Sequence, residues 1–389
     1  MAVTELRSGH CLLAAVAALM HVAVSTQAAT LPEERADAMY HRYDGGGVTV
    51  DGPSLLVRKN FKETLSVSGN YYVDNISSAS IDVIASGASK YTEERTEYSL
   101  AGDYLYGKSL FSAGVTYSDE SDYQAATYSL GVSQDFFGDL TTLSFGYSLG
   151  QDEVSQNGNN EFEEDIDRHS FRIGLNQVIT PKLVLAANYE LITDEGYLNN
   201  PYRSYRFLSD PLDPSAGYQF SREVYPQTRT SDAASLQFRY RLPWQAAVGG
   251  QYRFFTDDWG IDAHTTQVSY THVLYQHWTV DVLYRWYSQG QADFYQDLFL
   301  FPSQDEKDYR ARDKEMSEFS NQTLSLYVSY ERPLSWRYAY KAGITLQYDR
   351  ISFDYDNFTD LTVAETLPGD EPLYAFDADV YKLLFTLWY

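Results

Sequence analysis

The strongest constraint on the fold is a two-residue alternation of large apolar with small or polar side chains, repeated along most of the chain. It is clearest in the last segment, where one face carries only apolar or aromatic residues. Those residues are Tyr381, Leu383, Phe385, Leu387 and Tyr389. A period of two is typical of β-strands. Because the apolar face stays large and aromatic in strand after strand, an outer surface in lipid explains it better than a sandwich core.

The sequence therefore predicts an all-β fold, a transmembrane antiparallel up-and-down β-barrel of about 14 strands, with 12 to 16 possible. The predicted strands are 61–73, 92–106, 109–119, 123–136, 141–151, 165–178, 182–194, 229–243, 245–256, 260–274, 278–287, 321–332, 338–350 and 378–389. Tight connections alternate with longer ones rich in Asp, Asn, Gly and Pro. The longer connections are 74–91, 152–164, 195–228, 288–320 and 351–377. This pattern predicts short periplasmic turns and long extracellular loops.

The composition agrees with a membrane barrel. The mean hydropathy is −0.41, and no stretch after residue 29 reaches the roughly 18 apolar residues that a membrane helix needs. The 35 tyrosines suit aromatic girdles, in which a side chain is apolar in its body and wet at its tip. A net charge of −25 disfavours a nucleic-acid partner.

The first 29 residues have the pattern of a cleaved signal peptide. Arg7 precedes an apolar run from Cys11 to Val24, and small residues at Ala28 and Ala29 offer the cleavage site. Since Cys11 is the only cysteine, the mature chain is expected to lack disulfides and thiol chemistry. We expect export to the outer membrane of a Gram-negative bacterium.

Between the signal and the first predicted strand lies a lead segment, residues 30–60, followed by the barrel at residues 61–389. It contains a possible short helix from Glu33 to His41 and three consecutive glycines, Gly45 to Gly47. Two placements are open for it. It is expected either to hang in the periplasm or to fold into the lumen as a partial plug.

The last strand ends on an aromatic residue, Tyr389. Such a strand resembles the signal read by the barrel assembly machinery of the outer membrane. The expected partners are therefore that machinery and outer-membrane lipid, while a solute or protein partner stays unknown.

Four segments resemble the DUF3570 family of Gram-negative proteins. They are Tyr40 to Asp51, Asp74 to Ser89, Gly196 to Arg203, and Arg312 to Ser317. The resemblance extends over nearly all of the mature chain. It implies an envelope location and a barrel architecture, and it supplies no catalytic residue.

The sequence contains no motif of a zinc hydrolase, an α/β-hydrolase or a nucleotide-binding protein, and its histidines after residue 29 are scattered. Those histidines are His41, His169, His264, His272 and His277. Two acidic clusters, at 119–122 and 161–167, lack the spacing of a calcium loop and are expected to be solvated. No enzymatic activity, cofactor or metal site is predicted.

Charged residues on the polar faces of the predicted strands are candidates for the lumen or its constriction. They are Arg239, Arg241, Arg253, Arg285, Lys341, Glu190 and Asp281. A second mixed group, Arg312, Asp313, Lys314 and Glu315, leads out of a long loop. Such charges either form ion pairs that order the structure or line a permeation path, and the two alternatives differ in whether the residues face water.

Two functions follow from these alternatives. The first is a channel for small solutes with a charge-lined lumen. The second is a non-conducting envelope scaffold or surface-interaction barrel, plugged by its lead segment and loops, that serves a periplasmic or extracellular partner. The size of the barrel, the charged inner face and the long loops favour the channel, and the scaffold is the alternative, because the fold alone does not decide function.

Overall fold

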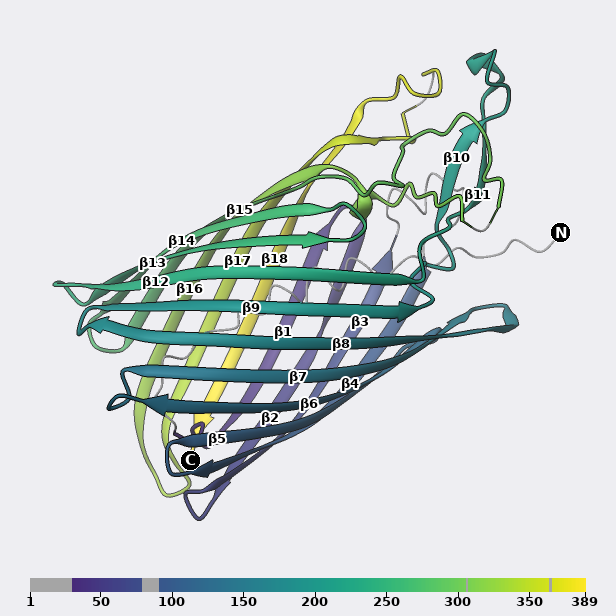
Figure 1. The fold of residues 1–389 in the computed structure, drawn as a ribbon. Helices are drawn as coiled ribbons and strands as arrows, with labels where there is room; N and C mark the ends of the chain where they lie inside the picture. Colours follow the sequence, from purple (N-terminus) through teal and green to yellow (C-terminus); the bar gives the residue numbers. More distant parts are fainter. Residues whose placement is uncertain (1–29, 79–90, 306, 364–365) are drawn as a thin grey trace.

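The computed structural model describes residues 30–389 apart from 79–90, 306 and 364–365, so the predicted signal peptide lies outside the described residues. Sixteen antiparallel strands in this part of the chain close into one barrel (Figure 1). The wall strands are β1 (Arg35–Gly45), β2 (Val48–Phe61), β3 (Leu65–Ser78), β4 (Tyr91–Tyr106), β5 (Ser109–Asp119), β6 (Tyr123–Phe136), β7 (Thr141–Gln156), β8 (Asn159–Thr180), β9 (Leu183–Gly196), β12 (Thr228–Leu242), β13 (Ala246–Asp257), β14 (Asp262–Leu274), β15 (Trp278–Gln289), β16 (Phe319–Trp336), β17 (Ala339–Thr359) and β18 (Leu373–Trp388).

The predicted barrel is confirmed, and all fourteen predicted strands are present, as β3 to β9 and β12 to β18. The predicted loop 152–164 is wrong, because β7 and β8 continue as one hairpin to a turn at Asn157 and Gly158. Val154 and Ile166 on this hairpin are buried, and acidic residues alternate with them. Those acidic residues gave the segment the composition of a loop.

The lead segment is part of the barrel wall, which corrects both placements predicted for residues 30–60. β1 and β2 form a hairpin, and β1 pairs with β18 in a register that sets Arg35 opposite Trp388. Gly46 and Gly47 make the hairpin turn at φ of 58° and 77°, a region that glycine enters without strain. A barrel in lipid cannot leave the edge of β18 unpaired, and this hairpin closes it.

The two ends of the barrel differ. We call one end the turn end, because every connection there has only two to four residues. These connections follow β2, β4, β6, β8, β12, β14 and β16. The start of β1 and the end of β18 also lie at this end. The other, here the loop end, carries the long connections, among them 197–227, 290–318 and 360–372. Both ends of the described wall therefore lie at the turn end, as an even number of strands requires.

The outer and inner faces of the wall also differ. On β18, Tyr381, Leu383 and Phe385 point outward and are 47%, 36% and 51% exposed, while Lys382 and Thr386 alternate with them on the inner face. The same alternation holds on the other strands, so large apolar side chains cover the outside. This is the surface of a transmembrane barrel. No helix in the described residues has the length and apolar character needed to cross a membrane.

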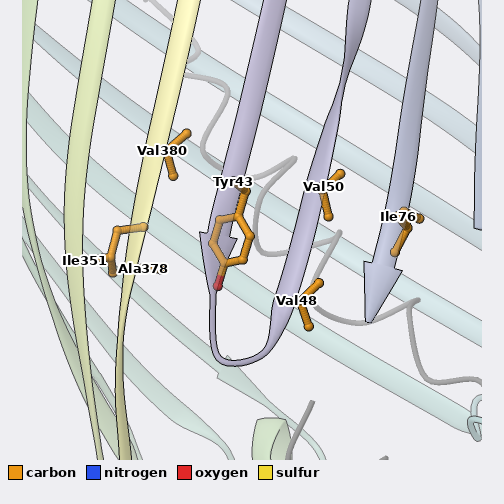
Figure 2. Close-up of a cluster of buried hydrophobic side chains, with 7 residues drawn as sticks. All are labelled: Tyr43, Val48, Val50, Ile76, Ile351, Ala378 and Val380. Carbon is orange, nitrogen blue, oxygen red and sulfur yellow. The ribbon is translucent and has the colours of Figure 1, made fainter. Parts of the chain in front are cut away.

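Apolar side chains pack the inner face of the seam near the loop end (Figure 2). They are Tyr43, Val48, Val50, Ile76, Ile351, Ala378 and Val380. They come from β1, β2, β3, β17 and β18, so strands from both chain ends share one cluster. Burying an aliphatic side chain of this size contributes about 1.5–3 kcal/mol relative to leaving it exposed.

The three long connections named above pack together beyond the wall, and we call their described residues the loop cluster. It includes a hairpin of β10 (Ser204–Leu208) and β11 (Tyr218–Arg222), and two 3-10 helices, η1 (Pro214–Ala216) and η2 (Lys314–Met316). A buried apolar core joins it to the β13–β14 turn. The core residues are Tyr225, Trp259, Ile261, Ala292, Tyr295, Ala311 and Met316.

Candidate functional site

Two of the predicted lumen residues, Arg239 and Arg241, point from β12 into the barrel and are exposed there. Their neighbours Phe238 and Tyr240 point outward, 45% and 39% exposed on the lipid side. Exposed side chains on the inner face mean that the other described residues leave space beside them.

Arg239 reaches across a strand. Its guanidinium donates a hydrogen bond to the Oγ1 atom of Thr271 on β14 at 3.1 Å, and the Thr271 hydroxyl donates in turn to the Asp281 carboxylate on β15. Gly249 on β13 lies between them in the register, opposite Arg239. With no side chain there, the arginine passes over β13.

Arg253 and Arg285 also point inward, from β13 and β15. The Arg253 guanidinium lies 5.6 Å from the ring centroid of Phe255. Neither arginine has an ion-pair partner among the residues that the structure describes.

The remaining wall residues are paired. The Arg172 guanidinium lies 2.6 Å from the Glu190 carboxylate on the inner face of β8 and β9. The Lys341 ammonium lies 3.2 Å from the Glu331 carboxylate and 3.8 Å from the ring centroid of Trp388. The charges on these strands therefore form ion pairs and still face water in part.

Arg312, Asp313 and Lys314 do not line the lumen, which corrects their prediction as constriction residues. They are 5%, 2% and 3% exposed inside the loop cluster, where Lys314 and Glu315 belong to η2. The Arg312 guanidinium lies 2.9 Å from Asp297 and over the Phe358 ring. Since these groups do not face water, the contacts favour loop ordering over solute selection.

Sequence reasoning missed Arg206, which lies at the centre of the loop cluster. Its side chain is fully buried and forms ion pairs with Asp297 and with Glu371, the latter at 2.5 Å. These partners are 91 and 165 residues away in the sequence, so no local spacing signals the contact. Burial alone would raise the pKa of the Asp297 carboxyl, but Arg312 and Arg206 hold that pKa below its usual range.

Glu223 is a second buried carboxyl of the loop cluster that the sequence did not reveal. It accepts hydrogen bonds from the backbone N–H of Arg312 and the hydroxyl of Tyr225, both at 2.7 Å. Burial raises the pKa of this carboxyl, and the nearby Asp313 carboxylate adds to the effect.

A polar group on β1, β3 and β4 was also missed. The Nε2 atom of His41 lies 2.7 Å from the Asp74 carboxylate, and the hydroxyl of Tyr72 lies 3.1 Å from the same nitrogen. Arg95 completes the group, 3.3 Å from Asp74. Gly52 faces His41 on β2, and the imidazole passes over it to reach Asp74. The group links β1, across β2, to β3 and β4 near the seam.

The other histidines stay scattered, as predicted. Three of them contact tyrosine hydroxyls on the outer face: His169 with Tyr147, His264 with Tyr252, and His272 with Tyr270.

The acidic residues near the β5–β6 turn gather more than predicted. Carboxylate oxygens of Glu93, Glu120 and Asp122 lie within 4.8 Å of one another. Asp122 is 1% exposed and accepts a hydrogen bond from the Tyr202 hydroxyl at 2.6 Å. The prediction of a solvated loop is therefore wrong for Asp122, which anchors the loop cluster to the wall.

One protein family matches the sequence. Its description reads "Protein of unknown function (DUF3570)", and the match extends over residues 85–172 and 159–347. No curated protein matches the chain.

Several solved barrels resemble the fold at low sequence identity. A bacterial polysaccharide outer membrane secretin aligns with a TM-score of 0.49 and 9% identity, over 92% of this chain and 100% of the other. The outer membrane protein opdK from Pseudomonas aeruginosa aligns with a TM-score of 0.42 and 10% identity, over 92% of this chain and 100% of the other. A FadL homologue from the same organism aligns with a TM-score of 0.41 and 10% identity, over 92% of this chain and 90% of the other.

Proposed function

Since the chain belongs to the DUF3570 family of proteins of unknown function, we propose a function from its own geometry. The protein is an outer-membrane channel that admits small solutes through a charge-lined lumen, and it has no enzymatic role. The turn end faces the periplasm and the loop cluster faces outward.

The observation that carries this proposal is the exposure of charged side chains on the inner face. Arg239 and Arg241 are exposed there, and the Arg172 side chain is 65% exposed although it is paired with Glu190. A charged group inside a barrel is stable at such positions because water reaches it. Small inward residues on β5 to β7 leave further room. They include Ser112, Gly114, Thr127, Gly131, Ser144, Gly146 and Ser148.

The outward residues of β18 support the membrane partners of the proposal. Tyr381, Leu383, Phe385 and Leu387 form one outward row along this last strand, beside Tyr389. Such a row meets lipid, and it presents the terminal signal to the barrel assembly machinery.

The alternative function, a surface-interaction barrel, draws on one observation. The loop cluster has its own buried core and a fully buried arginine, so it is an ordered surface rather than a set of solvated loops. The plug expected from residues 30–60 no longer supports this alternative, because those residues form β1 and β2.

The test is single-channel recording in planar bilayers. The refolded chain that begins at residue 30 is compared with an Arg239→Ala, Arg241→Ala double variant. Conductance steps whose ion selectivity shifts in the variant support the channel. A silent barrel that is correctly folded, as judged by heat-modifiable migration in gels, would contradict it and favour the surface-interaction alternative.

A further inference from the structure

Strand register places inward arginines of the wall in successive rows. Arg241 and Arg239 are two residues apart on β12, so they occupy adjacent inward positions. Arg239 is paired in the register with Gly249 on β13, which is paired with Ser269 on β14. Ser269 is paired with Leu283 on β15, so Arg239 and Leu283 share one row across the wall. Arg285 is two residues beyond Leu283 toward the loop end, and it therefore falls in the third row.

Arg253 falls in the fourth row, because it is level with Tyr287 across β14. We call Arg241, Arg239, Arg285 and Arg253 the arginine series. Adjacent rows on a strand are about 7 Å apart, and neighbouring strands are about 4.8 Å apart. Arg241 and Arg239 therefore lie within about one Debye length of each other at physiological ionic strength. Arg285 is offset from Arg239 by three strands and Arg253 by one, so the arginine series covers a strip of wall four strands wide.

The arginine series is not neutralised by the wall. Within the described ranges of the chain, none of its guanidinium groups forms an ion pair with a carboxylate. Two nearby inward carboxylates pair with other arginines: Glu190 with Arg172, and Asp257 with Arg229. Asp281 is joined to Arg239 only through the Thr271 hydroxyl, and Asp349 on β17 acts on Arg285 without an ion pair. The inward arginines of β12 to β15 still outnumber the inward aspartates of these strands. The strip of wall from β12 to β15 is therefore cationic, although the whole chain carries a net charge of −25.

Aromatic rings continue this strip at the loop end. Phe255, Phe319 and Tyr355 share one row across the wall, next to the row of Arg253. With three further inward rings they form what we call the aromatic band. Its members are Phe255, Tyr287, Phe319, Phe353, Tyr355 and Phe376.

Ring contacts join five members of the band, which are Tyr287, Phe319, Tyr355, Phe353 and Phe376. Tyr287 and Phe319 have centroids 5.6 Å apart, Phe319 and Tyr355 are 5.2 Å apart, and Phe353 stacks on Phe376 at 4.5 Å. All of these rings except Tyr355 are only partly buried. Phe319, Phe353 and Phe376 also pack against the buried Tyr355 and Phe358, so part of each ring is covered and part is exposed. The planar ring of a solute gains stacking contacts on such a surface.

We propose that this strip conducts small organic anions that carry an aromatic ring, such as aromatic monocarboxylates. The inference rests on the proposed channel function and names its solute class. The aromatic band holds the ring at the loop end, and the carboxylate passes from Arg253 to Arg285 and on to Arg239 and Arg241. Guanidinium groups bind carboxylates through two parallel hydrogen bonds, which suits this transfer.

Three solutes separate charge from ring character in a planar bilayer. Benzoate has both features, cyclohexanecarboxylate has the same charge on a saturated ring, and benzylammonium has an aromatic ring with the opposite charge. Permeability ratios are measured from reversal potentials with each salt in turn. We expect benzoate to permeate best and to exceed benzylammonium by about tenfold, the scale on which a charged cleft concentrates its counter-ion.

Variants assign the two contributions. Arg285→Ala with Arg253→Ala is expected to remove most of the preference for anions, and Arg285→Lys to keep it. Phe319→Leu with Phe353→Leu is expected to reduce only the difference between benzoate and cyclohexanecarboxylate. Arg350→Ala is the matched control, because Arg350 faces outward and pairs with Asp377 and Asp379 at 2.7 Å each. It is expected to change neither ratio.

The outcomes separate the two proposals. A folded but silent barrel would contradict the channel function itself. An open channel that passes benzoate and benzylammonium equally, or whose preference survives loss of Arg285 and Arg253, would overturn this inference and leave the channel standing.

Discussion

Two glycines of the inner wall have roles that depend on their missing side chains. Gly52 lies under the His41 imidazole on its way to Asp74, and Gly249 lies under Arg239 on its way to Thr271. A Cβ at Gly52 would lie 1.8 Å from the Val73 carbonyl oxygen, and one at Gly249 would lie 2.6 Å from the Ser269 hydroxyl. The His41–Asp74 and Arg239–Thr271 contacts each cross the strand between them, and each can form because that strand has a glycine, with no Cβ, at the crossing point.

Gly52→Ala is therefore expected to destabilise the barrel by about 2 kcal/mol, the usual scale for overpacking against fixed backbone. Urea unfolding of the refolded protein, followed by tryptophan fluorescence, measures the change. Gly102→Ala is the control, because a Cβ there meets nothing closer than 3.8 Å. Equal stability of the two variants would contradict the role given to Gly52.

Glu223 makes the loop cluster sensitive to pH. Its pKa is raised in the packed cluster by burial and by Asp313, so the packed form binds the proton more tightly than an opened form does. Protonated Glu223 therefore stabilises the packed loop cluster fully below the ordinary carboxyl pKa. This stabilisation is lost as pH rises through the raised pKa of Glu223. The groups that face Glu223 are Asp313, Arg203, the Tyr225 hydroxyl and the Arg312 backbone.

Protease cleavage within residues 197–227 is thus expected to speed up as pH rises from about 4.5 to about 8, with little further change above that. Glu223→Gln should flatten this dependence, while Glu318→Gln, at an exposed position, should keep it. A pH profile that is the same in the wild type and in Glu223→Gln would rule out the assignment.

At the scale of elements, the sequence was informative where a strand repeats its own pattern. Fourteen strands followed from alternation alone, because each has one lipid face. β1 and β2 were not predicted as strands, because three glycines and Pro53 interrupt their alternation. The acidic residues near Glu33 also resemble the start of a helix. The loop cluster was out of reach because Arg206 meets partners 91 and 165 residues away.

The seam between β1 and β18 is testable by cross-linking. Ala38 faces Phe385 in the register, and the chain from residue 30 onward has no native cysteine. Cross-strand Cα distances of about 4.5–5.5 Å suit a disulfide. Ala38→Cys with Phe385→Cys is expected to form one on mild oxidation, seen as a shift in gel migration, whereas Ala38→Cys with Tyr381→Cys is not. The reverse result would place β1 in another register or outside the wall.

The loop cluster is expected to open separately from the barrel. Arg206→Met leaves the buried Glu371 carboxylate without its cation, at a cost of about 3–5 kcal/mol. Hydrogen exchange should increase in β10 and β11, while exchange in the wall strands stays slow. Asp308→Asn breaks only the pair with Arg310 near the surface and should have little effect. Loss of protection throughout the wall in Arg206→Met would contradict a separate unit.

At the scale of the molecule, the distribution of charge matters more than its sum. The chain carries a net charge of −25, yet the inner strip of β12 to β15 presents guanidinium groups without ion pairs among the described residues. Charges lining a narrow, low-dielectric passage act on a solute more strongly than distant charges that salt screens. The outer apolar face meets lipid, and in the channel that we propose the inner strip sets which solutes enter.

The central claim is that this inner strip faces water in an open lumen. The most direct test is single-channel recording of an Arg239→Cys variant of the chain from residue 30, before and after an anionic, water-soluble thiol reagent is added. We predict a drop in conductance and a loss of anion preference on modification. Phe238→Cys, one residue away on the lipid face, should show neither change. Currents that ignore the reagent at position 239, or a folded barrel that carries no current at all, would contradict the account.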